Sequence, residues 1–241
     1  ANATDFTLSG TAKVKIDDAG DSSVDISTAI GVSKTFDNGM VLSLSNNNMG
    51  NAGELTLTSD AISVTFGDID QNEKNPGLNG NAADADISGD GASNASDNAG
   101  AISLGTSIGG VGIGAAMNNA GDTLFGASIT TDLGGIAMTV GADMYSDNDT
   151  GSDQTAMGVK ATLGSLVAVL NSVQNDTGTD DTNTYSATYT TGGLVIGMQG
   201  SDANTGAVSA TYTIVPGMQF EIGNEDNGTA TVSSAQLQMT F

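Results

Sequence analysis

The sequence predicts an all-β fold, a transmembrane antiparallel up-and-down β-barrel of about sixteen strands. Three observations support this fold. Apolar residues alternate with small or polar residues along most of the chain, the connections alternate between short and long, and the face opposite the apolar one is polar almost everywhere. Alternation with a period of two is typical of strands rather than helices. We therefore expect a single barrel domain over residues 1–241.

The alternating pattern recurs along the whole chain. In the last segment, for example, Leu237, Met239 and Phe241 alternate with Gln238 and Thr240. The pattern predicts strands near residues 5–16, 23–35, 39–46, 53–59, 61–69, 100–108, 110–118, 122–131, 134–146, 153–163, 165–174, 182–191, 193–200, 206–215, 217–224 and 229–241.

The connections between these strands fall into two classes. One class is tight and includes Asp37-Asn38-Gly39, Gly109-Gly110 and Gly192-Gly193, whose residues tolerate the positive φ angles of hairpin turns. The other class is longer and polar, as at residues 17–22 and 146–153. Short turns at one end and longer loops at the other are expected of an up-and-down barrel.

The apolar face of the strands is expected to point toward lipid. A barrel of about sixteen strands is too wide for side chains to fill, so its interior is polar and wet. The longest clear apolar run, residues 166–170, is far shorter than the roughly 20 residues of a membrane-spanning helix. Strands are therefore the elements that we expect to cross the membrane.

The composition excludes several classes of function. The chain has 28 acidic residues and 5 Lys without Arg, for a net charge of −23, which argues against nucleic acid as a partner. It has no Cys and no His, which excludes thiolate or imidazole metal sites, disulfides and His-dependent catalysis. Its Ser and Thr hydroxyls lack a His base, and its loop acids lack an apolar pocket. We therefore predict that the protein is not an enzyme.

One connection is much longer than the others. Residues 70–100 show no strand pattern and join the fifth and sixth predicted strands on the long-loop side. A structureless segment of this length inside a compact domain is usually functional or disordered. The alternative to a functional role is a flexible surface tip.

The layout resembles the sixteen-stranded general porins of Gram-negative bacteria, in the style of the alphaproteobacterial members. The resemblance rests on the opening strand over residues 6–14, the hairpin from 55–58 to 62–66, Gly67-Asp68 before the long loop, and the terminal residues 236–241. It covers the whole chain as a pattern, with low residue identity.

The resemblance implies an outer-membrane diffusion channel for small hydrophilic solutes and ions. It implies that the loop at residues 70–100 folds into the barrel as a constriction loop, and that the protein is a homotrimer in contact with outer-membrane lipid and lipopolysaccharide. It also implies an assembly signal at Leu237, Met239 and Phe241. The opening Ala1-Asn2-Ala3 has no signal-peptide pattern, so the chain is either cytosolic or a mature form whose signal has been removed, and the resemblance implies the mature form.

The family constriction opposes basic residues on the wall to acids on the loop, and this chain has only Lys for the wall. Lys13 and Lys15 match the wall position, and Lys160 also falls on a polar face, whereas Lys34 falls on the apolar face and is expected to extend toward the membrane interface. The predicted loop residues of the constriction are Asp70, Glu73, Lys74, Asp84, Asp86 and Asp90. Clustered acids favour cations, so we predict a cation preference; the alternative is that these charges belong to solvated loops.

These features require no cofactor. Calcium is the one ion for which the sequence offers candidate ligands. Asp84, Asp86 and Asp90 carry oxygen ligands at nearly alternate positions, as in half of an EF-hand loop, but the terminal Glu and the flanking helices are missing. The alternative is an ordinary Asp- and Gly-rich turn.

A second function stays open at this point. The acidic composition also permits a secreted or surface-attached calcium-binding β-structure, such as an adhesin, a solenoid or a filament subunit. A solenoid should show one short repeated period, and the segment lengths here vary.

Overall fold

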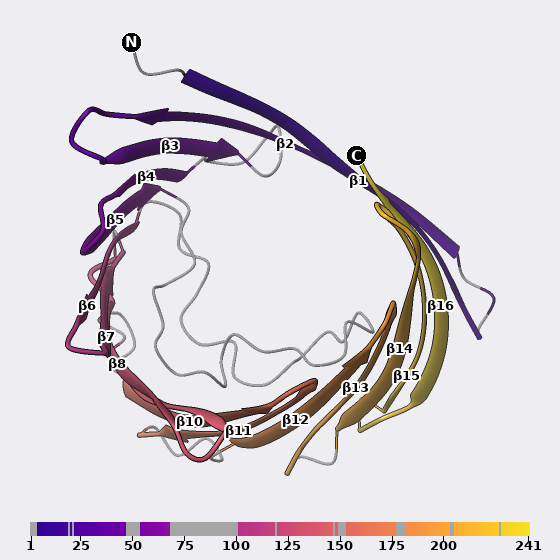
Figure 1. The fold of residues 1–241 in the computed structure, drawn as a ribbon. Coiled ribbons are helices and arrows are strands. Elements are labelled where there is room, and N and C mark those ends of the chain that lie inside the picture. The colour runs from indigo at the N-terminus through magenta and orange to yellow at the C-terminus, as the bar shows by residue number, and fades with distance from the viewer. Residues whose placement is uncertain are drawn as a thin grey trace.

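The strands of the computed structural model form one closed antiparallel sheet (Figure 1). The structure describes residues 4–18, 20, 22–46, 54–67, 101–118, 120–146, 148, 153–176, 182–202, 205–226 and 228–241. The strands are β1 (Thr4–Asp17), β2 (Ser22–Thr35), β3 (Val41–Asn46), β4 (Glu54–Thr58), β5 (Ile62–Gly67), β6 (Ala101–Ile108), β7 (Val111–Met117), β8 (Thr123–Asp132), β9 (Ala137–Ser146), β10 (Asp153–Leu163), β11 (Leu166–Asn175), β12 (Thr182–Thr191), β13 (Leu194–Ser201), β14 (Gly206–Val215), β15 (Met218–Asp226) and β16 (Thr231–Thr240).

Each strand pairs with its neighbours in the sequence, and β1 pairs with β16 to close the barrel. The predicted up-and-down barrel of sixteen strands is therefore confirmed. Among the described residues, no helix has the length and apolar character needed to span a membrane.

The short turns lie at one end of the barrel, as predicted. Between β6 and β7, Gly109 and Gly110 have φ angles of 61° and 84°, which L side chains adopt at a cost. Glycine at both positions lets two residues reverse the chain.

Among the strands that begin later than predicted, β3 and β9 do so because their first predicted residues belong to turns. Before β3, the backbone N–H of Phe36 donates to the carbonyl of Met40 at 2.8 Å, which closes a turn. Before β9, the N–H of Gly135 donates to Oδ1 of Asp132 at 3.0 Å. Such turn-stabilising Asp contacts interrupt the strand pattern locally.

The two faces of the sheet differ as the alternation predicts. Cross-strand partners share a face, and the apolar set is the more exposed one, with Ile26 70% and Leu170 63% exposed. The opposite set faces the lumen and includes the buried acids Asp143, 2% exposed, and Glu221, 3% exposed. The apolar face is therefore outward and the polar face lines the interior.

The seam between β1 and β16 closes the barrel at the C-terminus. Gly10 and Phe241 exchange two backbone hydrogen bonds, of 2.8 and 3.0 Å. A Cβ atom added at Gly10 would lie 2.6 Å from Cε2 of Phe241, so the ring occupies the space that a side chain would fill. Residues 4–9 of β1 extend past this point and pair only with β2 among the described strands.

Candidate pore lining

Lys13 and Lys15 lie on the lumen-facing side of β1. The cross-strand partners of Lys13 are Asp25 on β2 and Gln238 on β16. An ammonium group and a carboxylate therefore stand on directly opposed lumen-facing positions, where opposite charges attract.

Lys15 belongs to a second row of lumen-facing partners. Its neighbour on β16 is Gln236, whose own partner on β15 is Glu221. The Nε2 of Gln236 donates to Oε2 of Glu221 at 2.7 Å, and both side chains are buried. We call the lumen face of β15, β16, β1 and β2 the lysine wall.

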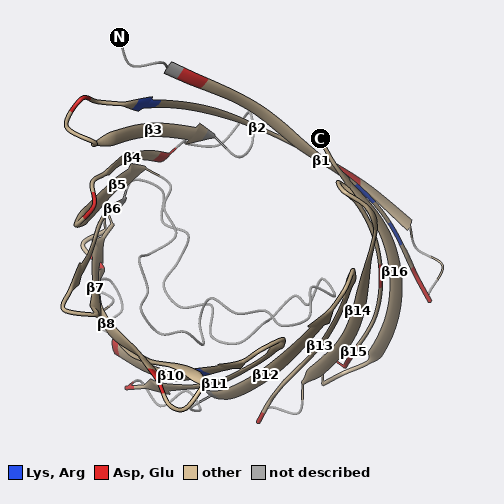
Figure 2. Ribbon diagram, in the orientation of Figure 1, with Lys and Arg blue, Asp and Glu red and all other residues tan. Residues whose placement is uncertain are grey.

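Lys160 lies on the lumen-facing side of β10. It is paired with Thr139 on β9, whose hydroxyl is 2.8 Å from that of Thr130 on β8. Lys160 is exposed, so its charge is available to ions inside the barrel. Figure 2 colours lysines blue, and blue appears both on β1 and near β10, on another part of the barrel.

Lys34 lies on the lipid-facing side of β2, as its parity predicts. Its cross-strand neighbour on β3 is Leu42, a lipid-facing residue. Its Nζ is 5.6 Å from the centroid of the Phe36 ring, within reach of a cation–π interaction. Lys34 is therefore not part of the pore lining.

Carboxylates on the strands are the lining residues that the sequence reasoning missed. Eight acids occupy lumen-facing positions of the described strands, against the three lysines above. The pairing register places on this face Asp5, Asp17, Asp25, Glu54, Asp132, Asp143, Glu221 and Glu225. The sequence signal that could have found them is the alternation of faces along a strand, because these acids alternate with apolar residues just as the lysines do.

A second region of the lumen surface is almost bare. In each strand from β6 to β10, one lumen-facing position near the middle of the strand is a glycine. We call this surface the glycine wall, and it consists of Gly105, Gly114, Gly126, Gly141 and Gly158. Asp143 is the acid of this wall, with Gly126 and Ala156 as its cross-strand partners.

The predicted loop residues of the constriction lie outside the described residues, namely Asp70, Glu73, Lys74, Asp84, Asp86 and Asp90. The structure does fix the two ends of this segment. Gly67 at the end of β5 is paired with Ala101 at the start of β6, so the segment leaves and re-enters the sheet at neighbouring positions.

The predicted assembly residues share one face at the end of β16. Leu237, Met239 and Phe241 are all exposed on the lipid-facing side. The three side chains therefore form a continuous apolar strip beside β1.

The predicted calcium ligands, Asp84, Asp86 and Asp90, also lie outside the described residues. Within the part of the chain that the structure describes, no three His, Cys, Asp or Glu side chains come together in a way that could hold a metal ion.

Comparison with known proteins gives a match at the level of structure. No protein-family model matches the sequence, and no curated protein matches it either. A solved mutant of Rh. blastica porin superposes with a TM-score of 0.71 at 15% identity, covering 99% of this chain and 100% of that one. A triple mutant of Rhodopseudomonas blastica porin gives 0.65 at 16%, with the same coverage. The chain thus has the sixteen-stranded barrel fold of these porins.

Proposed function

We propose that this chain is an outer-membrane porin, a water-filled diffusion channel for small hydrophilic solutes and ions. The observation that carries the proposal is a closed barrel with an apolar outer face and a charged, polar lumen face. A closed sheet satisfies its backbone groups without water and is therefore suited to lipid. Single-channel recording in a planar bilayer tests this: stepwise ohmic conductance is expected, and persistent silence of the folded protein contradicts it.

The pore is proposed to prefer cations. Eight carboxylates and three ammonium groups occupy the lumen-facing strand positions described above, and acids along a pore favour cations. A reversal potential measured across a KCl gradient should have the sign of cation permeation. Anion preference contradicts the selectivity and leaves the channel function standing.

Residues 70–100 are proposed to form a constriction loop that folds into the barrel. Two observations support this: the segment is anchored next to β6, and the glycine wall beginning on β6 leaves room inside. The natural chain has no Cys, so a disulfide between Asp86→Cys and Ser128→Cys reports proximity to the lumen face. The matched control is Ala127→Cys, which faces lipid; equal cross-linking of both variants contradicts the inward fold.

A homotrimer is proposed because the first hairpin presents a large apolar surface. Phe6 and Leu8 are each 67% exposed, and residues 4–9 pair only with β2 among the described strands. Sheet edges with unpaired backbone groups are costly in lipid, and a neighbouring copy would cover this one. Light scattering after chromatography in mild detergent should give three chains, and a monomer contradicts it.

The remaining partners follow from the same placement. Outer-membrane lipid and lipopolysaccharide would surround the apolar face, and Leu237, Met239 and Phe241 would act as the assembly signal.

Calcium would bind at Asp84, Asp86 and Asp90. Calorimetric titration of the folded protein with Ca²⁺ tests this last point, with Asp86→Asn and Asp90→Asn expected to abolish the heat of binding.

A further inference from the structure

Four polar side chains form one row across the lumen face of the lysine wall. Gln219 on β15 is paired with Gln238 on β16, which is also the partner of Lys13 on β1. Lys13 is in turn paired with Asp25 on β2. The row ends there, because β3 pairs with β2 only over residues 30–35. An ammonium group and a carboxylate therefore stand side by side at the open end of the row.

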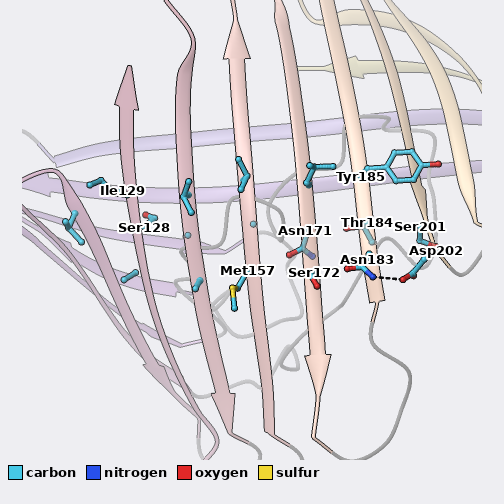
Figure 3. Close-up of a pocket in the computed structure, with 18 residues that line it drawn as sticks. Ser128, Ile129, Met157, Asn171, Ser172, Asn183, Thr184, Tyr185, Ser201 and Asp202 are labelled. Carbon is cyan, nitrogen blue, oxygen red and sulfur yellow. Dashed lines mark hydrogen bonds between the residues drawn. The ribbon is translucent and has the colours of Figure 1, made fainter. Parts of the chain in front are cut away.

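Other carboxylates of the barrel accept hydrogen bonds from side-chain amides. Nδ2 of Asn183 donates to Oδ2 of Asp202 at 2.7 Å, as the dashed line in Figure 3 shows. Nε2 of Gln236 donates to Oε2 of Glu221 at the same distance. The Asp25 carboxylate, by contrast, has neither a hydrogen-bond nor an ion-pair partner, as far as the described part of the chain shows.

The Lys13 ammonium is in the same state as the Asp25 carboxylate. Directly opposed residues have Cβ atoms about 5 Å apart. Even so, the two side chains form no ion pair with each other in the described structure, and neither has another side-chain partner there. Asp25 is exposed and Lys13 is half-buried, so both charges are presented to the lumen.

The amide on the other side of Lys13 is also incompletely satisfied. Oε1 of Gln238 is buried and has no hydrogen-bond partner among the residues that the structure describes. Buried acceptors in folded proteins are nearly always paired. The terminal torsion of a Gln side chain is soft, so the amide can turn this oxygen toward a donor on a bound solute. An acceptor on each side of the ammonium thus lacks a donor from the protein.

The two adjacent charges select a solute that carries both signs. Lys13 attracts an anion and Asp25 repels it, and for a cation the two effects are reversed, so a singly charged solute gains little from the pair. A solute with an ammonium and a carboxylate a few bonds apart can satisfy both side chains, and each contact is a charge-assisted hydrogen bond. Such a solute has no net charge, so this selection is separate from the ion preference of the pore.

We propose that Lys13 and Asp25 bind small zwitterionic solutes of the α-amino acid class as they pass through the pore. The solute carboxylate accepts from the Lys13 ammonium, and the solute ammonium donates to the Asp25 carboxylate. The inference rests on the proposed channel function and names a solute class for it.

Saturation-transfer NMR of the full protein, folded in mild detergent, tests the proposal. The probes are L-alanine and lactamide, an uncharged molecule of the same size, so neither probe carries a net charge. Half-saturation by alanine should require about one tenth of the lactamide concentration, the ratio expected for one charge-assisted hydrogen bond. Equal half-saturating concentrations overturn the proposal.

Two single variants localise the site. Lys13→Gln and Asp25→Asn each remove one of the two charges and should raise the half-saturating alanine concentration to the lactamide level. The matched control is Lys34→Gln, which removes a lysine from the lipid-facing side of β2 and should bind alanine like the unmodified chain. Alanine preference that survives in Lys13→Gln places the site elsewhere and overturns the proposal.

Exchanging the two charges separates the pair from the general charge of the lumen. The double variant Lys13→Asp with Asp25→Lys keeps one charge of each sign on the same two positions. Alanine can bind it in the reverse orientation, so the preference lost in the single variants should return. A double variant that has a folded band in unboiled gels and binds alanine no better than lactamide contradicts the pairing.

Single-channel recording separates this inference from the proposed function. A conducting pore that binds alanine and lactamide equally overturns only the solute site. Preference for alanine in a protein that never conducts overturns only the channel.

Discussion

The lysine wall and the glycine wall line the same lumen but contribute different properties. The lysine wall presents long polar side chains from β15, β16, β1 and β2, including Lys13, Lys15 and Glu221. The glycine wall presents bare backbone and one buried acid, Asp143. The difference shows that the lysine wall supplies opposed charges and the glycine wall supplies space, although Lys160 and Asp132 add charge to the lumen face of β10 and β8.

The largest expected effect comes from breaking the seam that holds the lysine wall closed. Gly10→Val forces the Phe241 ring out of the space it occupies, because the added Cβ would lie 2.6 Å from that ring. Because the Phe241 ring is exposed and can swing aside, the cost is expected at the lower end of the about 1–3 kcal/mol found for overpacked cores. The variant should therefore lose its folded band in unboiled gels at a lower temperature than the unmodified chain.

The matched control for this change is Ala12→Val, which adds bulk at the next lipid-facing position of β1. It should melt within a few degrees of the unmodified chain. If both variants melt at the same lowered temperature, added bulk anywhere on β1 is harmful and the contact of Phe241 with Gly10 has no special role.

The second effect tests the charge of the lysine wall. Replacing Lys13 and Lys15 with Gln removes two lumen-facing cations without changing the glycine wall. One unit charge about 4 Å from an ion is worth about 1 kcal/mol in bulk water, or about a fivefold change in relative permeability. Reversal potentials should shift toward stronger cation preference, and an unchanged potential would remove these lysines from the ion path.

A smaller difference is expected between the acids of the two walls. Asp143→Asn should weaken cation preference more than Glu221→Gln, because the row that contains Glu221 also contains Lys15, which already offsets its charge. Asp143 has Gly126 and Ala156 as its cross-strand neighbours. Reversal potentials of the two variants, measured in the same salt gradient, give the order directly.

The smallest effect is expected outside both walls. Lys34→Gln removes a cation from the lipid-facing side and should leave the reversal potential unchanged. Loss of its contact with the Phe36 ring, worth about 0.5–1 kcal/mol, should slightly lower the thermal midpoint. A clear change in selectivity would show that this face also borders the ion path.

Most of the fold could be predicted from the sequence because its signals are local. Period-two alternation marked each strand, and Gly-rich turns such as Gly109-Gly110 marked the short connections. The lumen positions of Lys13, Lys15 and Lys160 followed from parity alone. The predicted starts of β3 and β9 were too early because a hydrogen bond in the preceding turn delays the start of strand pairing.

What could not be predicted depends on register between strands. The opposition of Lys13 and Asp25 requires knowing how the first hairpin pairs, and the hydrogen bond from Gln236 to Glu221 requires the pairing of β15 with β16. The contact of the Phe241 ring with Gly10 joins two segments that are far apart in the sequence, and no local pattern indicates it.

The seam between β1 and β16 also sets the order in which the barrel can form. Every other strand pair joins sequence neighbours, whereas this one joins Thr11 to Thr240. Closing so long a loop has the largest entropic cost of any pairing and gains nothing until both strands are in place. The hairpins therefore form first and closure comes last, so a defect at Gly10 should speed unfolding more than it slows folding.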